Sequence, residues 1–516
     1  MQAVGFRTSG RTGVLTILAC GAVSTLGQVP PPPPAPGPIA SGYDTGTPGV
    51  DVLTRGPIHE AFAQPINTGS IKLPVVPNKP AEPIDELPPS VKPDNPNAIW
   101  IGGYWSWADD CKDFIWVSGV WRVPPPNMQW VPGYWAQVRG GYQWTAGFWS
   151  PAAQPQATYY PAPPATKERG PTGDPPTAHC CWVSGCWRWR GGRFAWQAGY
   201  WAPAQDDCIW VSASYYWCPR GWVFRDGYWD YPLAARGLMF APCRFRHGLQ
   251  LQAGFVFCPT VCIDCGLLTL NLFVRPGYFH YYFGDYYGVE YDWLGIYPWF
   301  DMGQYPDFAY DPLFTYYRWY HRDRDPQWQT NLKGWHHHYR SHPDERPPHD
   351  MAAQFRLVAA GGTRPDKDFL TIGLTVDALR INPQGSIKVV DLSAAEQARF
   401  HETARSTRQL ETERSRLESK GAAGHGKDPH GLALPRVPQG VAAGHAGAPG
   451  GGTGTKNSMH RKSFSDAMKP PKIDWSVKHL ERTLLPPPHY GGGSGRDSGG
   501  GGTERRSDRA EHDHQK

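Results

Sequence analysis

Three cysteines near the middle of the chain have the spacing of ligands to a metal cluster. Cys258, Cys262 and Cys265 form the pattern C-x-x-x-C-x-x-C, with which radical enzymes hold an iron–sulfur cluster through three thiolates. The surrounding stretch, FVFCPTVCIDC, has the composition of a β-strand, and no βα-barrel pattern of alternating strands and helices surrounds it. Disulfide bonds or buried structural thiols therefore fit these cysteines better than a metal centre.

Five histidines lie close together further along the chain and could bind a transition metal. They are His336, His337, His338, His342 and His349, within WHHHYRSHPDERPPHD (335–350). A metal site needs fixed ligand geometry and supporting hydrogen bonds, whereas the proline, arginine and aspartate of this stretch are typical of a loop. We expect a solvated loop without a bound metal.

Acidic residues are interleaved with tyrosine and tryptophan between positions 285 and 311. Carboxylates among aromatic side chains are typical of glycoside hydrolases, and also of loops that bind glycans or calcium. Nothing in their spacing fixes a carboxylate pair in space, so we expect structural turns, with glycan or cation binding as the alternative. The six residues are Asp285, Glu290, Asp292, Asp301, Asp307 and Asp311.

The sequence contains no Gly-rich phosphate loop, nucleophile elbow or H-E-x-x-H motif. We therefore predict a protein that is not an enzyme, with no catalytic residues, no cofactor and no metal ligands. The formal net charge is +5 over 516 residues, and Lys and Arg form no sustained stripe. A nucleic-acid partner is therefore not expected.

The elements that must position any such site are built from a tryptophan repeat. Six unbroken copies of W-x-x-G-x-W lie in two blocks, and their first tryptophans are 14 or 16 residues apart within a block. Such a fixed spacing indicates a repeat architecture. Two departing copies begin at Trp210 and Trp222. The tryptophans of the unbroken copies, which are also the candidate ligand face, are Trp100, Trp105, Trp116, Trp121, Trp130, Trp135, Trp144, Trp149, Trp182, Trp187, Trp196 and Trp201.

The repeat predicts antiparallel β-structure with two alternative local geometries. In the first, the two middle residues of W-x-x-G-x-W form a hairpin turn, and a second turn follows in the nine-residue step. Gly191 and Gly192, for example, would place Trp187 opposite Trp196. All tryptophans then form a continuous ladder on one face of a meander. In the second geometry the motif is one strand bent by a glycine bulge.

The tryptophan ladder has two alternative uses. It could form a core shared by two layers, or its exposed rings could stack on sugar rings and bind a polysaccharide. Because short strands offer little other apolar mass, we expect the ladder to be buried. The opposite face carries apolar residues such as Val131 and Tyr134, so the sheet should pack against another layer or another molecule.

These motifs resemble the W-x-x-G-x-W repeats, also written YXWGXW, of exported bacterial proteins that abound in planctomycete-like bacteria. The resemblance covers residues 98–231, about a quarter of the chain. The tyrosine-rich segment FVRPGYFHYYFGDYYG (273–288) is similar to one that accompanies such repeats. The resemblance implies export and a place in the cell envelope or outside the cell. The family has no established catalytic activity, so it supplies no catalytic residues.

The N-terminus has the features of an export signal. Arg7 and Arg11 precede an apolar run at 13–23, and small residues near Gly27 suit cleavage. The run is too short to span a bilayer, so we expect no transmembrane helix in the mature chain. The sequence ILAC, which ends at Cys20, resembles a lipoprotein processing site, so anchoring through Cys20 is the alternative to secretion.

An exported chain would meet an oxidising compartment, where cysteines form disulfides. Ten cysteines remain if Cys20 is removed or lipidated, and an even number permits complete pairing within or between chains. Besides Cys111, the candidates are Cys180, Cys181, Cys186, Cys208, Cys218, Cys243, Cys258, Cys262 and Cys265.

The remaining segments differ in composition. Pro-rich stretches cannot bury a core, and Ser393 with Glu396 forms a capping box that opens a charged helix. The expected order is a signal peptide (1–27), a Pro-rich disordered segment (28–97), repeat block 1 (98–150), a Pro-rich linker (151–178), repeat block 2 (179–234), an aromatic β-rich region (235–350), a short β region (351–392), the charged helix (393–421) and a disordered Gly/His/basic tail (422–516).

The expected fold is mainly β: a short-strand antiparallel meander of 14-residue tryptophan repeats, with disordered Pro-rich and Gly-rich flanks and one charged C-terminal helix. The expected function is that of a non-enzymatic exported protein of a bacterial envelope, acting as a structural or interaction module through its repeats. The alternative is a carbohydrate- or cell-wall-binding protein that uses aromatic stacking. Its partners would be cell-wall polysaccharide, other envelope proteins or a second copy of the chain.

Overall fold

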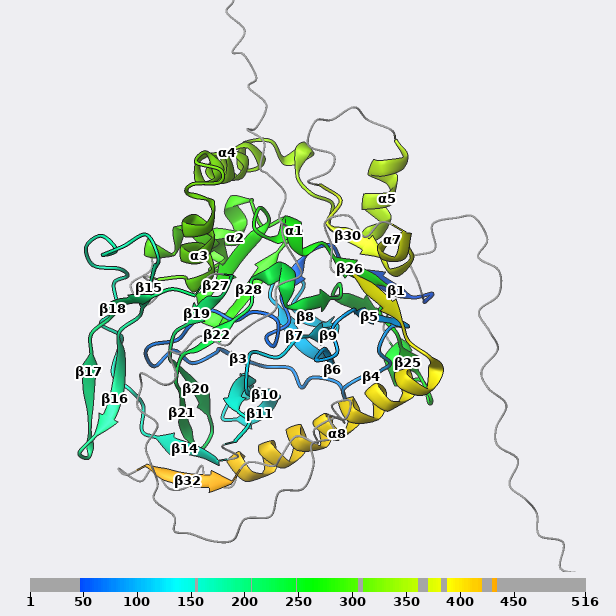
Figure 1. The fold of residues 1–516 in the computed structure, drawn as a ribbon. Coiled ribbons are helices and arrows are strands. Elements are labelled where there is room, and N and C mark those ends of the chain that lie inside the picture. Colours follow the sequence, from blue (N-terminus) through cyan, green and yellow to red (C-terminus); the bar gives the residue numbers. More distant parts are fainter. Residues whose placement is uncertain are drawn as a thin grey trace, which may run out of the picture. The chain divides into compact units, whose positions relative to one another are not determined.

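A computed structural model describes residues 47–153, 156–205, 207–246, 248–304, 310–360, 370–381, 388–419 and 429–433 (Figure 1). The predicted signal peptide, Cys20 and most of the predicted C-terminal tail lie outside these residues. The chain divides into two compact units after Asp44, and all the described residues belong to the second unit.

The described residues form a mainly β fold with many short antiparallel strands and few helices. No helix in this part of the chain is both long enough and apolar enough to cross a membrane. The helices are α1 (Cys265–Leu268), α2 (Val289–Trp293), α3 (Pro312–His321), α4 (Trp328–Ser341), α5 (Met351–Ala359), α7 (Val376–Ile381) and α8 (Ala394–Ser419).

Four long hairpins carry the tryptophans, and each arm of a hairpin consists of two short strands separated by a break of two residues. Hairpin I contains β6 (Ile99–Ile101), β7 (Tyr104–Ala108), β8 (Asp113–Val117) and β9 (Val120–Arg122). Hairpin II contains β10 (Met128–Val131), β11 (Tyr134–Val138), β12 (Gly141–Thr145) and β13 (Phe148–Pro151). Hairpin III contains β15 (Cys180–Val183), β16 (Cys186–Arg190), β17 (Arg193–Gln197) and β18 (Tyr200–Pro203). Hairpin IV contains β19 (Ile209–Val211), β20 (Ser214–Cys218), β21 (Gly221–Arg225) and β22 (Tyr228–Asp230).

Each hairpin places two pairs of tryptophans directly opposite each other. The outer pairs are Trp100 with Trp121, Trp130 with Trp149, Trp182 with Trp201 and Trp210 with Trp229. The inner pairs are Trp105 with Trp116, Trp135 with Trp144, Trp187 with Trp196 and Trp217 with Trp222.

The nine-residue step is a hairpin turn, as predicted, but the five-residue step is not. Gly191 and Gly192, with φ of 57° and 76°, form the turn that places Trp187 opposite Trp196. The five-residue step is the break between two strands of one arm, so the continuous ladder of a meander was the wrong prediction. The alternative, one strand bent by a glycine bulge, does not describe the arrangement either, because each break omits two residues from both arms and neither arm carries an extra residue.

Tryptophan packing explains why the break requires glycine. The first tryptophan of each unbroken copy lies against the glycine of the copy paired with it. A β-carbon on Gly147 would lie 2.4 Å from Cζ2 of Trp130, and one on Gly133 would lie 2.4 Å from Cζ2 of Trp144. These separations are too short for any side chain. Glycine is therefore required at this position because an indole ring packs against it, and not because the chain turns there.

Other strands extend three of the hairpins on their second arm. β24 and β23 pair with β8 and β9 of hairpin I, β3 pairs with β12 of hairpin II, and β14 pairs with β21 of hairpin IV. Among the described residues, no third strand pairs with hairpin III. These and the other strands are β1 (Val50–Val52), β2 (Gly56–Pro57), β3 (Val75–Val76), β4 (Asp85–Glu86), β5 (Val91–Pro93), β14 (Gln156–Tyr160), β23 (Gly237–Met239), β24 (Cys243–Phe245), β25 (Val256–Phe257), β26 (Val261–Ile263), β27 (Leu272–Arg275), β28 (His280–Phe283), β29 (Tyr297–Pro298), β30 (Gly373–Thr375), β31 (Val389–Asp391) and β32 (His430–Ala433).

The Pro-rich segments are more ordered than we expected. Residues 47–97 contribute β1–β5, and Ile58 and Phe62 are fully buried in the main core. In the predicted linker, Ala157 and Tyr159 of β14 are also buried. The prolines limit these strands to a few residues, but the apolar residues between them still pack.

The region after hairpin IV contains more helix than the predicted β-rich regions. The tyrosine-rich segment forms β27 and β28, which lie between β2 and β29 in one sheet. The histidine-rich stretch, predicted to be a loop, begins in α4, because Trp328, Leu332, Trp335 and Tyr339 form one buried helical stripe. The described residues between 351 and 392 form α5 and α7 as well as the short strands β30 and β31.

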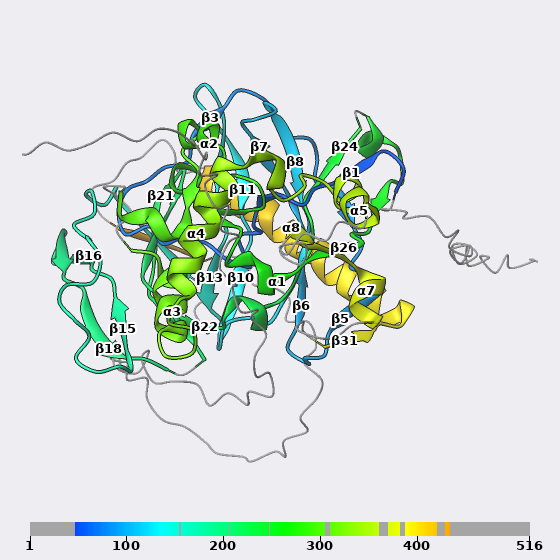
Figure 2. The same ribbon diagram turned by 90° about the horizontal axis from the view of Figure 1, so that it is seen from above.

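Helix α8 begins at the predicted capping box and packs against hairpins I and II. The Ser393 amide donates to Glu396 Oε2 over 2.9 Å, and the Glu396 amide donates to Ser393 Oγ over 3.3 Å. Near the other end of α8, Arg414 donates to the carbonyls of Pro132 and Ala146, which lie in the breaks of the two arms of hairpin II. In Figure 1 the helix (yellow) extends beside these hairpins, and Figure 2 shows it from above.

We predict that Gly147→Ala destabilises the fold by about 1–3 kcal/mol, because the new methyl group would overlap Trp130 and force the hairpin to move. Chemical denaturation of both proteins would measure the loss. Gly277→Ala is the matched control, because a β-carbon at Gly277 meets nothing within 4 Å. Equal stability of Gly147→Ala and the wild type would contradict the packing described for the repeat.

Candidate functional site

The repeat tryptophans are used inside the protein rather than displayed on its surface. Of the twelve in unbroken copies, nine are buried, and only Trp135, Trp196 and Trp201 are half-buried. Opposite rings meet edge to face or tilted, as in Trp130–Trp149 with centroids 5.3 Å apart. This geometry is the favourable one for aromatic pairs. The described repeats therefore present no continuous aromatic platform to a ligand.

In each of hairpins I, II and III, a different buried glutamate binds residues at the break between the short strands. Each carboxylate accepts hydrogen bonds from a repeat glycine amide and from the indole N–H of a repeat tryptophan. Glu60 accepts from Gly147 over 2.8 Å and from Trp144 over 3.0 Å. We call this arrangement the carboxylate joint. It supplies an acceptor for the glycine amide where the ladder between the two arms is interrupted.

The equivalent joints of hairpins I and III use glutamates from other segments. In hairpin I, Glu86 of β4 accepts from Gly103 over 2.7 Å, from Gly119 over 3.0 Å and from Trp116 over 3.0 Å. In hairpin III, Glu168 accepts from Gly185 and from Trp182. All three glutamates lie outside the repeats that they join.

Burial and hydrogen bonding shift the pKa of these three carboxyl groups in opposite directions. Burial raises the pKa of Glu60 to about 7, although the hydrogen bonds from Trp144 and Gly147 favour its ionised form. Burial likewise raises the pKa of Glu86 and Glu168 above the ordinary value.

Hairpin IV, which contains the two departing copies, lacks this joint. Its first arm has Ala213 at the position that glycine occupies in the unbroken copies. The indole nitrogens of Trp210 and Trp229 are buried and have no hydrogen-bond partner among the described residues, as is also true of Trp100 and Trp121 in hairpin I. In hairpin IV the glycine of the first arm is thus replaced, and no carboxylate among the described residues forms a joint there.

One cavity that could admit a ligand lies between the turn of hairpin I and the tyrosine-rich sheet. Its volume is about 380 Å³. Arg55, Arg244, Arg275, Asp109 and Asp110 contribute charged groups to its wall, and Trp107, Tyr282 and Tyr286 contribute aromatic rings. The balance of both charges suits a polar neutral ligand better than a strongly anionic one.

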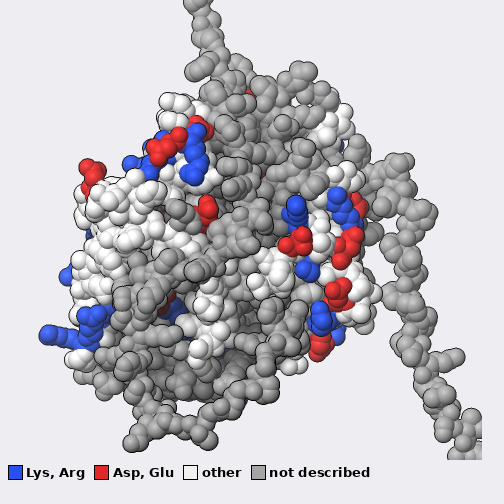
Figure 3. All heavy atoms as spheres, in the orientation of Figure 1, with Lys and Arg blue, Asp and Glu red and all other residues white. Residues whose placement is uncertain are grey.

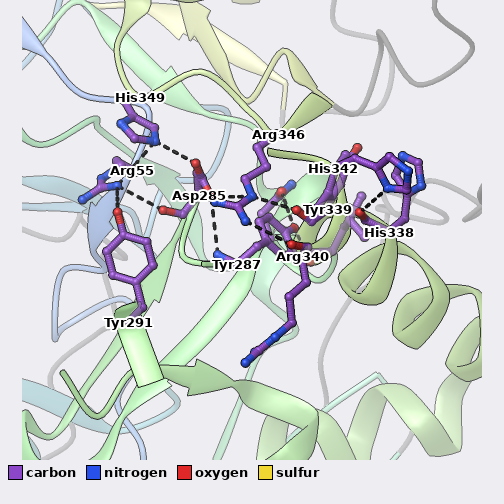
Figure 4. Close-up of polar contacts among 12 residues, drawn as sticks. Arg55, Asp285, Tyr287, Tyr291, His338, Tyr339, Arg340, His342, Arg346 and His349 are labelled. Carbon is purple, nitrogen blue, oxygen red and sulfur yellow. Dashed lines mark hydrogen bonds and ion pairs between the residues drawn. The ribbon is translucent and has the colours of Figure 1, made fainter. Parts of the chain in front are cut away.

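A polar network that includes Arg55 and His349 forms one side of this cavity (Figure 4). His349 Nε2 lies 2.7 Å from Asp285 Oδ2. Arg55 donates to the Tyr291 hydroxyl oxygen over 2.6 Å and to the Asp285 carbonyl over 3.2 Å, and it pairs with Asp110. The network joins residues from four distant parts of the chain.

Asp109 fixes the turn of hairpin I to the tyrosine-rich sheet. Its carboxylate pairs with Arg275 at 2.5 Å and accepts hydrogen bonds from Tyr278 over 2.5 Å and from Trp107 over 2.9 Å. Partial burial alone would raise the pKa of Asp109, but these hydrogen bonds and the Arg275 charge outweigh it and lower the pKa to about 2.

The acidic residues predicted as candidates have separate partners. Asp285 binds His349, Asp292 pairs with Arg340 at 2.5 Å, and Asp311 caps α3 and accepts from the Tyr281 hydroxyl. Asp301 lies in a short 3₁₀ helix and Glu290 in α2, whereas Asp307 lies outside the described residues.

The histidines also have separate roles. His336 is buried with Nε2 2.8 Å from the Leu270 carbonyl, and His338 lies 2.8 Å from Glu345. His342 contacts the carbonyl of His338, and His337 is exposed. Within the described ranges, no three His, Cys, Asp or Glu side chains are grouped as metal ligands would be.

The expected disulfides within the chain are not formed among the described residues, where all ten cysteines are free. Cys258, Cys262 and Cys265 fit the alternative of structural thiols: burial raises the pKa of all three, to about 12 for Cys258. A raised thiol pKa disfavours the thiolate that metal binding requires.

Local sequence motifs did not point to the residues of the joints and the polar network. Glu60, Glu86 and Glu168 lie 14 to 87 residues from the repeat glycines and tryptophans that they bind, and Arg55 lies more than 200 residues from Tyr291. A single acidic residue in an apolar stretch, such as Glu60 in PIHEAFA, was the one available signal.

Comparison with known proteins adds no relative. No protein-family model, no curated protein and no solved structure matches the chain.

We predict that Asp109→Asn reduces the acid sensitivity of the fold. Because the folded-state pKa is lowered, Asp109 contributes stability above about pH 4, and this contribution is lost as the pH falls through about 2. The variant should be less stable than the wild type by about 1–2 kcal/mol at pH 7, with the difference shrinking towards pH 2.

Denaturant unfolding at a series of pH values would test this, with the exposed Asp51→Asn as control. A difference between Asp109→Asn and wild type that stays constant from pH 7 to pH 2 would count against the ion pair and hydrogen bonds described.

Proposed function

We propose that the chain is a non-enzymatic exported protein of a bacterial envelope and acts as a structural or interaction module through its tryptophan repeats. The observation that carries the proposal is the burial of nine of the twelve tryptophans in paired hairpins. Rings packed in this way stabilise a scaffold and leave the surface of the hairpins for contacts. The N-terminal sequence, with Arg7 and Arg11 before an apolar run, supports export.

The carboxylate joints support the same role. Each one ties a hairpin to a segment from elsewhere in the chain: Glu60 and Glu86 precede hairpin I, and Glu168 precedes hairpin III. A buried carboxylate that lost its donors would be costly, so the joints favour a single arrangement of hairpins. Such rigidity is useful in a protein whose task is to hold surfaces in place.

Cell fractionation tests export. When the full chain is produced in a bacterium with an outer membrane, we expect it in the envelope or outside the cell, and a chain lacking residues 1–27 in the cytoplasm. Recovery of the full chain in the cytoplasm would contradict the proposal. Hot-detergent extraction with and without reductant would then show whether the exposed Cys111 or the half-buried Cys180 and Cys181 link chains in the envelope.

A carbohydrate- or cell-wall-binding function is the second candidate, and one exposed ring favours it. Trp293 at the end of α2 is 89% exposed. The residue next to it, Leu294, lines the 380 Å³ cavity together with charged and aromatic side chains. A flat exposed ring next in sequence to a residue that lines a polar cavity is a suitable place for a sugar ring to stack, whereas the buried repeat tryptophans are not.

For this second function we predict that Trp293→Ala weakens binding of soluble cell-wall glycan fragments by about tenfold, measured by calorimetry. Ile381→Ala, which removes another highly exposed apolar side chain, should leave the affinity unchanged. Unaltered binding by Trp293→Ala, or no binding by the wild type, would exclude this site.

A further inference from the structure

Hairpin III differs from the other three hairpins because no further described strand pairs with its second arm. The second arms of hairpins I, II and IV are each covered by another strand of the chain. The second arm of hairpin III, β17 and β18, pairs only with its own first arm among the described residues. Figure 1 shows β17 at the left margin of the molecule, with β16 between it and the remaining elements.

The register of hairpin III determines which backbone groups point outwards. Arg190 and Arg193 flank the two-residue turn, so they form the hydrogen-bonded pair that closes it. Hydrogen-bonded pairs alternate along an antiparallel ladder, which makes Arg188–Ala195 the next one. The amides and carbonyls of Phe194 and Trp196 therefore face away from β16. An edge with such free groups is a template for another strand.

We propose that β17 pairs with β17 of a second copy of the chain, antiparallel, about a two-fold axis at Ala195. This inference rests on the proposed structural role and names its interaction surface. In this register Phe194 lies opposite Trp196 of the second copy, and the outward groups of both residues form hydrogen-bonded pairs. Arg193 lies opposite Gln197 of the second copy, so no arginine faces another across the join.

The side chains on both faces of β17 agree with this register. On one face, Phe194 packs on Trp189 and Trp196 packs on Trp187, with ring centroids 4.9 and 5.2 Å apart. Joining two copies continues this aromatic stripe across four strands, and aromatic pairs directly opposite each other stabilise a sheet. The small Ala195 on the other face allows the two strands to approach at the axis.

The charges of the hairpin favour an antiparallel join over a parallel one. Arg190 and Arg193 are exposed beside the turn, and Arg188 is paired with Asp226 at 2.5 Å. Figure 3 shows basic side chains in the area where β16 and β17 lie in Figure 1. Antiparallel pairing places the two arginine-bearing turns at opposite ends of the joined sheet, where their repulsion is smallest.

Sedimentation of the full chain over a range of concentrations tests the proposal. We expect the wild type to form dimers, and Ala195→Glu to raise the dimer Kd by about tenfold or more, because two carboxylates would lie directly opposite each other. Within the hairpin, residue 195 lies opposite Arg188, so the new glutamate should not disturb the fold. Near-ultraviolet circular dichroism of the tryptophans would check this.

Two further variants make the test specific. Ala198→Glu adds the same charge at an exposed position beyond β17 and should dimerise like the wild type. A mixture of Ala195→Glu and Ala195→Lys should form heterodimers, because opposite charges then meet at the axis. A monomeric wild type, or folded Ala195→Glu that dimerises as well as the wild type, would overturn the proposal.

The outcome is distinct from that of the function test. A monomeric chain that is found in the envelope would remove only the pairing of hairpin III. A dimeric chain that stays in the cytoplasm would remove the envelope role and leave the pairing intact.

Discussion

The carboxylate joint is the interaction on which hairpins I, II and III depend. Each unbroken copy places an indole ring against a glycine of the opposite arm, at the point where the ladder between the arms is interrupted. The glycine amide then needs an acceptor, and a buried glutamate supplies it while also accepting from an indole N–H. Tryptophan, glycine and glutamate are thus coupled, because removing one leaves either a void or an unpaired buried polar group.

This coupling also organises the segments around the hairpins. Because the glutamates come from outside the repeats, the Pro-rich segment before hairpin I and the segment before hairpin III are held inside the fold. In hairpin II a second charged side chain binds the residues at the break: Arg414 of α8 donates to the carbonyls of Pro132 and Ala146. The paired Glu418 in turn accepts from Tyr134 and Tyr159, which joins the helix, the hairpin and β14.

Local features of the structure could be predicted from the sequence, and distant ones could not. The Gly191–Gly192 turn and the Ser393–Glu396 capping box depend on neighbouring residues, and both are present. The five-residue step was mistaken for a turn because spacing alone does not distinguish a turn from a bend. The glycine's actual contact, a tryptophan on the opposite arm, is revealed only by the pairing. The glutamates, Arg55 and Arg414 act over long separations in the chain, so no motif contained them. For α4, the run of histidines and prolines suggested a loop, although Trp328, Leu332 and Tyr339 have the spacing of one buried helix face.

Hydrogen exchange of the glycine amides tests the central claim most directly. Resolved by NMR, the Gly147 and Gly119 amides of the wild type should exchange as slowly as the buried strands, because each donates to a buried carboxylate. Glu60→Gln should accelerate exchange at Gly147 and leave Gly119, which is held by Glu86, unchanged. Fast exchange of both amides in the wild type, or an equal response of both to Glu60→Gln, would contradict the account.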